Sequence, residues 1–332
     1  MLNIFLYTGE NKPQDDLVHG YISHLYNVNE FRLVEIDIQS DLAAHQKYIG
    51  KTPYIEVGPY HIQQPKSSDP IRTIIQSAGE RQARLMTNDP GYGKRVEAST
   101  RLTKNDRLGY WASRKYMNVI ILILAIYLGL PFLSPVLQKL GFNSAANVIQ
   151  SIYRPLCHQL AYRSWFLFGE QPAYPRKLAD IDGWITYEDA TGLDSHDLLA
   201  ARALTGNEIL GYKVAYCERD VAIYAGMLFT AVLFALTGRR WKGIPWYLWL
   251  AIGIAPLGLD GASQLPSLLN LNLPWLLVRE STPLLRTITG LLFGITTAWF
   301  GLPLFEETMW ESRQQLIKKM ALVRAIEDEK RK

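Results

Sequence analysis

Three apolar stretches, residues 117–137, 221–238 and 284–305, constrain most strongly what this chain can fold into. Each is about twenty residues long and nearly free of charge, which is the length that an α-helix needs to cross the hydrocarbon core of a bilayer. Residues 245–259 form a shorter apolar stretch whose tryptophans and tyrosine suit a membrane interface. The sequence therefore predicts an all-α integral membrane bundle of about four transmembrane helices.

The rest of the chain divides into a charged N-terminal part and a basic tail. The mean hydropathy of −0.03 averages over a soluble region and an apolar one. We expect a domain at residues 1–87, a linker at 88–116, a membrane domain at 117–305 and a charged cytosolic tail at 306–332. The formal net charge of +4 is mild and comes largely from Lys and Arg beside the apolar stretches, so no nucleic-acid partner is expected.

Basic residues flank the apolar stretches on alternate sides. They gather before the first stretch at 104–115, between the second and third at 239–242, and in the tail at 318–332. Positively charged connections stay on the cytoplasmic side of a membrane. The first residues carry no signal peptide, so the N-terminal domain should also stay in the cytosol. The pattern predicts a multi-pass protein of the cell membrane with both termini cytoplasmic.

One further segment, residues 149–168, competes as a span. It contains Arg154, His158 and Arg163, which a lipid-facing helix could accommodate only at high cost. A crossing here would also move the basic connection at 239–242 to the outside. We therefore expect an interfacial or re-entrant helix that packs against the bundle.

The N-terminal domain shows an alternating pattern of strands and helices. Its β-α-β-α-β-β-α order resembles the thioredoxin fold, most closely a glutaredoxin-like domain, and Thr52-Pro53 stands where that fold has a cis-proline. The expected strands are 2–7, 31–37, 54–57 and 60–62, and the expected helices are 14–26, 41–49 and 70–86.

The resemblance lacks the chemistry of that fold. Glutaredoxins carry Cys-x-x-Cys where this chain reads TGENKP at residues 8–13, and the domain contains no cysteine. Thiol exchange requires a thiolate, so a redox role for this domain is excluded. Binding of a cytosolic protein partner and a purely structural role both stay open.

Four polar clusters stand at the ends of the apolar stretches. Because ionisable groups at membrane depth are costly, such a gathering usually has a function. The predicted topology puts all four at the extracytoplasmic end of the bundle, and helical spacing would set Gln159 near Arg163, and Asp260 near Gln264. The clusters are Cys157-His158-Gln159 with Arg163, Cys217-Glu218-Arg219-Asp220, Asp260-Gly261 with Gln264, and Arg279-Glu280-Ser281 with Arg286.

An ordered set of motifs runs through these clusters: Cys157-His158-Gln159-x3-Arg163-Ser164, Cys217-x-Arg219-Asp220-x-Ala222-x-Tyr224-x-Gly226, Pro256-x3-Asp260-Gly261-x2-Gln264 and Arg286-x2-Thr289-Gly290-x3-Gly294. The set resembles an uncharacterised bacterial membrane family, domain-of-unknown-function family 2085. The resemblance implies an integral membrane protein with a shared polar site and no established activity. Family members often place the two cysteine clusters closer together, whereas residues 176–210 intervene here as a lid or an inert insertion.

Cys157 and Cys217 are the two cysteines of the chain. Both fall on the predicted extracytoplasmic side, where disulfides persist, so we expect a structural disulfide and no cofactor. The alternative is a zinc site that uses Cys157, His158 and Cys217 with Asp220 or Asp260, although adjacent Cys and His are an uncommon ligand spacing. A redox-active pair is the third hypothesis.

The clusters support three hypotheses of function. The first is a membrane enzyme that acts on an anionic or lipid substrate, with His158, Asp260 or Asp220 as acid or base. The second is a transporter or binding protein that uses the same pocket. The third is a structural or signalling protein whose disulfide and ion pairs only brace the bundle. The substrate-binding side chains would be Gln159, Arg163, Arg219, Tyr224, Gln264, Arg279 and Arg286.

Overall fold

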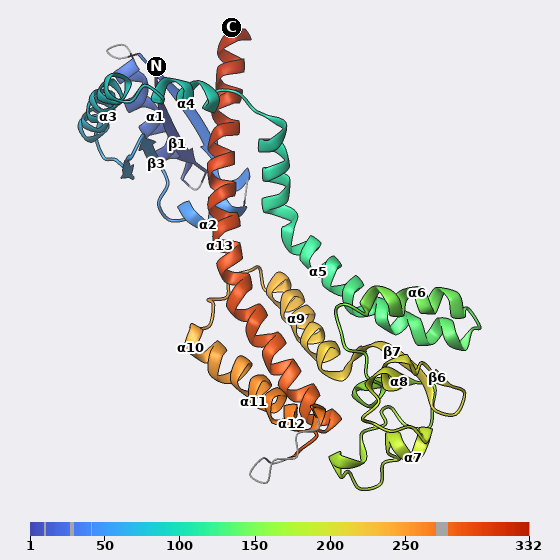
Figure 1. Cartoon of the computed structure of the whole chain (residues 1–332). Helices are drawn as coiled ribbons and strands as arrows, with labels where there is room; N and C mark the ends of the chain where they lie inside the picture. Colours follow the sequence, from blue (N-terminus) through green and yellow to red (C-terminus); the bar gives the residue numbers. More distant parts are fainter. Residues whose placement is uncertain (10, 27–29, 41, 270–277, 332) are drawn as a thin grey trace. The chain divides into compact units, whose positions relative to one another are not determined.

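The computed structural model describes residues 1–9, 11–26, 30–40, 42–269 and 278–331 of the chain. Its contacts divide it into two compact units, which we treat separately (Figure 1). The head unit comprises Met1–Lys115 and Glu307–Lys332, and the helical unit comprises Tyr116–Glu306. Two long helices, α5 (Lys104–Lys139) and α13 (Pro283–Arg331), contribute residues to both.

The head unit is a mixed four-stranded sheet with helices. The sheet has the order β2-β1-β3-β4, in which β1 pairs parallel to β2 and antiparallel to β3, and β3 pairs antiparallel to β4. The predicted β-α-β-α-β-β-α order is therefore observed, and the Thr52–Pro53 peptide bond is cis. The elements are β1 (Leu2–Thr8), α1 (Lys12–Tyr26), β2 (Phe31–Asp37), η1 (Ile38–Ser40), α2 (Leu42–Tyr48), β3 (Tyr54–Val57), β4 (Tyr60–Gln63) and α3 (Ser68–Asn88).

Each face of this sheet carries its own core, because successive side chains of a strand point to opposite faces. Ile4 and Leu6 of β1 pack with apolar residues of α1 and α3. Tyr7 belongs to the other core, where it stacks on Tyr48 with ring centroids 4.0 Å apart and where Ile317 of α13 is buried. The C-terminal part of α13 thus covers one face of the sheet within the head unit.

Ion pairs accompany this covering helix. The Arg32 guanidinium donates to both oxygens of Glu329 at 2.9–3.0 Å, and Lys318 pairs with Glu56 at 2.5 Å. Residues 306–332, the predicted charged cytosolic tail, belong to α13, which continues without a break through residue 306. Its last part packs into the head unit because Ile317, Met320 and Ala321 supply an apolar face.

Most of residues 88–116, the predicted linker, are helical. Residues 92–99 form α4 (Tyr92–Ser99), and α5 begins at Lys104. A reciprocal cap explains the second start: Thr103 Oγ1 accepts from the Asp106 N–H at 3.2 Å, while Asp106 Oδ2 accepts from the Thr103 N–H at 2.8 Å. The Gly and Pro residues at 90–93 are typical of a loop, but the helix-forming residues that follow them form α4 in the structure.

The helical unit contains the apolar helices. Four helices of the described residues are long and apolar enough to cross a membrane: Lys104–Lys139, Glu218–Leu236, Trp246–Ser267 and Pro283–Arg331. They coincide with the four predicted stretches. The third is continuous from α10 (Trp246–Leu248) through the π-helical η4 (Trp249–Ile254) and α11 (Ala255–Ser263) into α12 (Leu265–Leu268).

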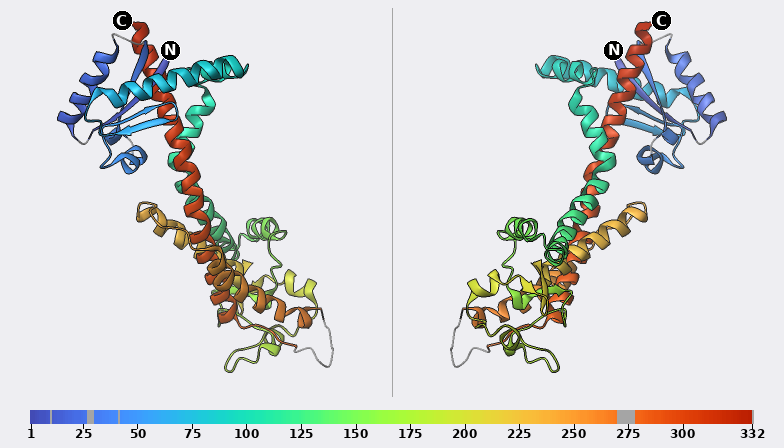
Figure 2. Two further views of the ribbon diagram at one scale, coloured as in Figure 1. Left: turned by 90° about the vertical axis from the view of Figure 1, so that its left-hand side faces the viewer. Right: turned by 90° about the vertical axis from the view of Figure 1, so that its right-hand side faces the viewer.

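Residues between the first two apolar helices form a small subdomain rather than a loose insertion. Its antiparallel sheet has the order β5-β7-β6, and Tyr162, Tyr174 and Tyr187 are buried in its core. Both views of Figure 2 show it gathered at one end of the helices of its unit. The elements are α6 (Asn143–Tyr153), η2 (Ala161–Arg163), β5 (Ser164–Leu167), η3 (Lys177–Ala179), α7 (Tyr187–Thr191), α8 (Leu198–Ala203), β6 (Gly206–Asn207) and β7 (Gly211–Cys217).

The re-entrant helix expected at 149–168 is wrong. Helix α6 ends at Tyr153, just before Pro155, which has no N–H and cannot continue the helical hydrogen bonding. The chain then turns through Gln159, which has a φ of +52°, into strand β5. Gln159 and Arg163 are consequently not helical neighbours, and the segment is part of the subdomain.

Helices α9 (Glu218–Leu236) and α13 pack closely through the glycines of the Gly-x3-Gly ridge. A Cβ atom on Gly290 would lie 2.7 Å from the carbonyl oxygen of Arg219, and one on Gly294 would lie 2.1 Å from that of Ile223. Only glycine permits this approach of two backbones. The contact places the first turn of α9 beside the first turns of α13, where the polar clusters lie.

Candidate functional site

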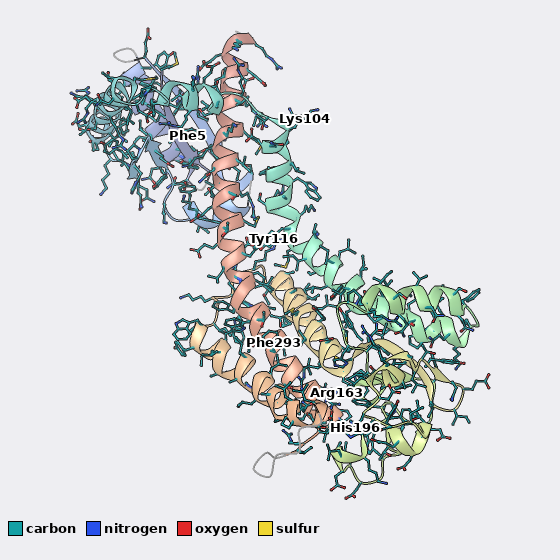
Figure 3. All side chains as sticks on the ribbon, viewed as in Figure 1. Phe5, Lys104, Tyr116, Arg163, His196 and Phe293 are labelled. Atoms are coloured by element: carbon teal, nitrogen blue, oxygen red, sulfur yellow. The ribbon has the colours of Figure 1, made fainter. Side chains whose placement is uncertain are left out.

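The four polar clusters meet at one end of the helical unit. Figure 3 shows Arg163 at this end, near the start of α13, and Phe293 farther along the same helix. The clusters come from the 157–163 segment, the first turn of α9, the end of α11 and the start of α13. Two buried carboxylates, Glu280 and Asp260, organise the meeting.

Glu280 is the centre of the first ion cluster. Arg163 donates to its two oxygens at 2.9 and 3.0 Å, Arg176 Nη1 lies 3.2 Å from Oε2, and Arg286 makes a third pair. Arg286 also binds Glu218 at 3.1 Å. The Glu280 side chain is only 1% exposed, so removing this carboxylate would leave three guanidinium groups without their shared partner.

Asp260 is the centre of the second ion cluster. It pairs with Arg219, and its Oδ2 accepts from Ser281 Oγ at 3.0 Å and from Gln264 Nε2 at 3.2 Å. Arg279 lies 3.6 Å from Oδ1. Gln264 joins the two clusters because its Oε1 accepts from Arg286 at 3.3 Å.

A cavity of about 260 Å³ opens beside these clusters. Arg219 and Arg286 line it, and the Nε of each has no hydrogen-bond partner among the described residues. Around the site, five guanidinium groups face four carboxylates, which leaves a formal positive charge. The groups are Arg163, Arg176, Arg219, Arg279 and Arg286 with Glu218, Asp220, Asp260 and Glu280.

Both cysteines face the same cavity. They are free thiols in the structure, and Cys157 Sγ, Cys217 Sγ and a ring nitrogen of His158 all lie within 4.8 Å of one another. A hydrogen bond with Cys157 and burial raise the pKa of the Cys217 thiol. The predicted disulfide stays a prediction, and the predicted zinc alternative names the same three residues.

Buried polar contacts hold the Cys-His segment in place. Gln159 Nε2 donates to the carbonyls of Gln150 and Ala215, each at 2.9 Å. Lys213 Nζ donates to the carbonyls of Gln159 and Arg202 at 2.9 and 2.8 Å. These bonds satisfy the turn at Gln159 and connect it to β7, whose last residue is Cys217.

Two basic groups near the cavity have lowered pKa values. Burial lowers the pKa of Lys213 to about 7. Desolvation by the surrounding protein lowers the pKa of His158, and the positive charges of Arg163 and Arg286 lower it further. His158 is therefore neutral at pH 7, and its Nδ1 accepts from the Leu160 N–H at 3.1 Å.

Some of the predicted site residues line the cavity, and others lie away from it. The cavity is lined by Leu156, Cys157, His158, Arg163, Cys217, Arg219, Asp220, Gln264 and Arg286. Asp260 and Arg279 lie in the ion cluster behind the cavity, Gln159 binds backbone, and Tyr224 stacks with Tyr216 in an aromatic cluster. Sequence reasoning missed Arg176 and Lys213, because no local signal shows that a charged residue of an insertion or a strand will be buried.

Two of the comparisons with known proteins found a match, and one of the two describes a membrane protein. Residues 207–300 match a family described as "Predicted membrane protein (DUF2085)". The chain is also 27% identical over 203 residues to the uncharacterised protein MJ1492 of the archaeon Methanocaldococcus jannaschii, an alignment that covers 59% of this chain and 96% of that protein. No solved structure matches. The matched segment contains the Cys217, Asp260 and Arg286 motifs of the cavity, so this chain is similar to a family of membrane proteins in the part that forms the site.

Proposed function

We propose that this chain is a multi-pass membrane protein that binds a phosphate-bearing ligand in the cavity lined by Arg219, Arg286 and His158. The supporting observation is that the side chains of Arg219 and Arg286 line this cavity, and the buried Nε of each has no hydrogen-bond partner among the described residues. Guanidinium groups bind phosphate oxygens through strong charge-assisted hydrogen bonds. The neutral His158, with its proton on Nε2, supplies a further donor and is the group placed to move a proton.

The size and charge of the cavity fit a small anion. A volume of about 260 Å³ is at the lower end for ligand sites and suits a headgroup or free phosphate better than a large metabolite. The excess of guanidinium groups over carboxylates gives the bound anion a charge partner. A membrane phospholipid and a soluble phosphate share this chemistry.

Titration calorimetry of the purified protein in a neutral detergent tests the proposal. One arm uses inorganic phosphate and the other a short-chain phosphatidylglycerol, with diacylglycerol as the uncharged lipid control. Arg219→Gln should weaken binding about 10–100-fold, as loss of one or two charge-assisted bonds predicts. Asp260 keeps the hydrogen bonds from Ser281 and Gln264 and the nearby charge of Arg279 in this variant, so a folded chain is expected.

Arg154→Gln is the matched control, since Arg154 is an exposed arginine of the same unit outside the cavity lining. Its affinity should equal that of the unaltered chain. Binding by neither phosphate nor phosphatidylglycerol, or equal weakening by both substitutions, would show that the proposal is wrong. Uptake of phosphate into proteoliposomes would assign the transporter instead of the enzyme or binding protein.

We further propose four spans with both termini cytoplasmic, so that the cavity faces the extracytoplasmic side. The basic connection 239–242 between the second and third apolar helices supports this orientation. A cysteine introduced at Leu199, which is 80% exposed, should react with a membrane-impermeant thiol reagent on intact cells, whereas one at Arg240 should not. The native cysteines are buried and give a low background. The opposite labelling pattern would reverse the orientation.

For the head unit we propose a thioredoxin-like scaffold that binds a cytosolic protein. Its strand order and its lack of cysteine support a role without thiol exchange. An open hollow beside Gly9, Lys12 and Asp16 lies where the redox motif of the resembling fold would begin. A photo-crosslinker at Lys12 should capture one discrete protein in cells; capture at Lys12 no stronger than at the exposed Lys66 would contradict the proposal.

A further inference from the structure

We infer that Cys157, His158 and Cys217 form a zinc site with one coordination position open to the arginine-lined cavity. Thiolate sulfur and imidazole nitrogen are the ligands that Zn²⁺ prefers. Three protein ligands with an open fourth position are the arrangement of catalytic zinc sites, whereas structural sites are closed by a fourth residue.

The distances suit such an ion. With metal–sulfur bonds of about 2.3 Å and metal–nitrogen bonds of about 2.0 Å, tetrahedral ligand atoms lie roughly 3.3–3.8 Å apart. The three candidate atoms all fall within 4.8 Å of one another, so small side-chain rotations bring them to an ion. Both cysteines are buried, which protects the metal–sulfur bonds from solvent.

Backbone N–H groups already point at the candidate ligand atoms. The Cys217 N–H donates to Cys157 Sγ at 3.3 Å, and the Asp220 N–H donates to Cys217 Sγ at 3.4 Å. Cys217 is also the N-cap of the nineteen-residue helix α9, whose positive end favours negative charge. Once a metal has displaced the thiol protons, these donors and the helix N-terminus stabilise the negative charge left on the sulfur atoms.

His158 needs one adjustment to serve as a ligand. Its Nδ1 lone pair is directed at the Leu160 N–H, so a metal at Nδ1 replaces this bond, and a metal at Nε2 requires the other tautomer. The residue as a whole is exposed, so this adjustment displaces one hydrogen bond and no other residue of the core.

The open position identifies the role of the ion in the site. Arg219, Asp220 and Arg286 line the same cavity as the three ligands. An anionic oxygen in the cavity can thus bind the metal and the guanidinium groups together. This part rests on the proposed phosphate ligand, whereas the metal site itself rests on the three side chains.

Metal analysis of protein purified without reductant or chelator tests the site. We expect about one zinc per chain, and Cys157→Ser or Cys217→Ser should lower it at least fivefold. His196→Gln, which alters a histidine of the subdomain outside this cavity, is the control and should keep its zinc. Chain without metal whose two cysteines are joined in a disulfide by non-reducing mass spectrometry would overturn the inference.

Cobalt titration keeps the test valid if the serine variants do not fold. Metal-stripped, unaltered protein should develop a cobalt–thiolate charge-transfer band that saturates at one equivalent, and absence of the band would overturn the site. The two proposals fail separately. A metal-loaded chain that binds no phosphate would contradict the proposed function and support the zinc site. A chain that binds phosphate but no metal would contradict the zinc site and support the proposed function.

Discussion

The apolar core of the head unit and the polar end of the helical unit bury different kinds of side chain. The main core of the head is formed by aliphatic and aromatic residues such as Ile4, Leu6 and Val18, and its ion pairs lie near the surface. The polar end of the helical unit instead buries Arg286 and Glu280 at 2% and 4% exposure. An apolar core stabilises a fold in proportion to its buried area, whereas a buried ion cluster barely offsets its own desolvation.

The buried ion clusters of the helical unit are therefore the place to look for a functional site. A bundle that needed only stability could pack apolar residues at the end of α13, as the head does around Ile317. The five guanidinium groups that gather at this end of the unit are what the proposed anionic ligand would require.

Glu280→Gln should be the most damaging single change in the helical unit. It leaves three guanidinium groups without their shared carboxylate, which should cost about 3–5 kcal/mol in the free energy of unfolding. The matched change in the head, Glu56→Gln, breaks one partly exposed pair with Lys318 and should cost at most about 1 kcal/mol. Denaturant unfolding in detergent measures both. Equal losses of unfolding free energy for the two substitutions would contradict this difference between the two units.

Ile317→Ala should destabilise the head unit by about 2–4 kcal/mol, because it opens a cavity against Tyr7 and Tyr48. Ile288→Ala, in the same helix but 45% exposed, should change stability by much less. Hydrogen exchange of strand β1 reports the head alone. Unchanged exchange in the Ile317 variant would mean that α13 is not part of the head core.

Gly294→Ala should cost about 1–3 kcal/mol, since the added Cβ meets the Ile223 carbonyl oxygen 2.1 Å away. Gly301→Ala, where nothing lies within 4 Å, should be neutral or slightly stabilising. Thermal unfolding of the two variants separates packing from helix propensity. A harmless Gly294 variant would contradict the close approach of α9 and α13.

Lys213 should make stability depend on pH. Its pKa is about 7 in the folded chain and near 10.5 when unfolded, so the unfolded chain binds more protons between these values. Stability should rise by about 1 kcal/mol per pH unit from pH 7 toward 10.5 and level off below pH 7. Lys213→Met removes this slope. Parallel pH profiles for both proteins would show that Lys213 is not buried as a neutral amine.

Sequence patterns predicted what depends on periodicity and composition. The strands of the head and the four apolar helices follow from residues local to each element, such as the uncharged run at 117–137. The convergence of Asp260, Arg219 and Arg286 could be anticipated because membrane topology sets helix ends on one side. In that sense the location of the candidate site was predictable.

Tertiary contacts decided the rest. Arg176 binds Glu280, which lies 104 residues later in the sequence. Lys213 is buried in strand β7 and donates to the carbonyl of Gln159, which lies 54 residues earlier. The turn at Gln159 replaced the expected helix because Pro155 and the bonds to Gln150 and Ala215 favour it. None of these partners can be read from local spacing.

The phosphate affinity of an Arg219→Met/Asp260→Leu double variant tests the central claim most directly. Replacing a buried ion pair by apolar residues of similar size is often neutral for stability, so the fold should persist. Because Ser281 and Gln264 also lose the Asp260 acceptor, we predict a loss of about 1–3 kcal/mol in the free energy of unfolding and at least tenfold weaker phosphate binding by the folded chain. A strongly destabilised variant whose remaining folded fraction binds phosphate as tightly as before would show that the charged cluster only braces the bundle.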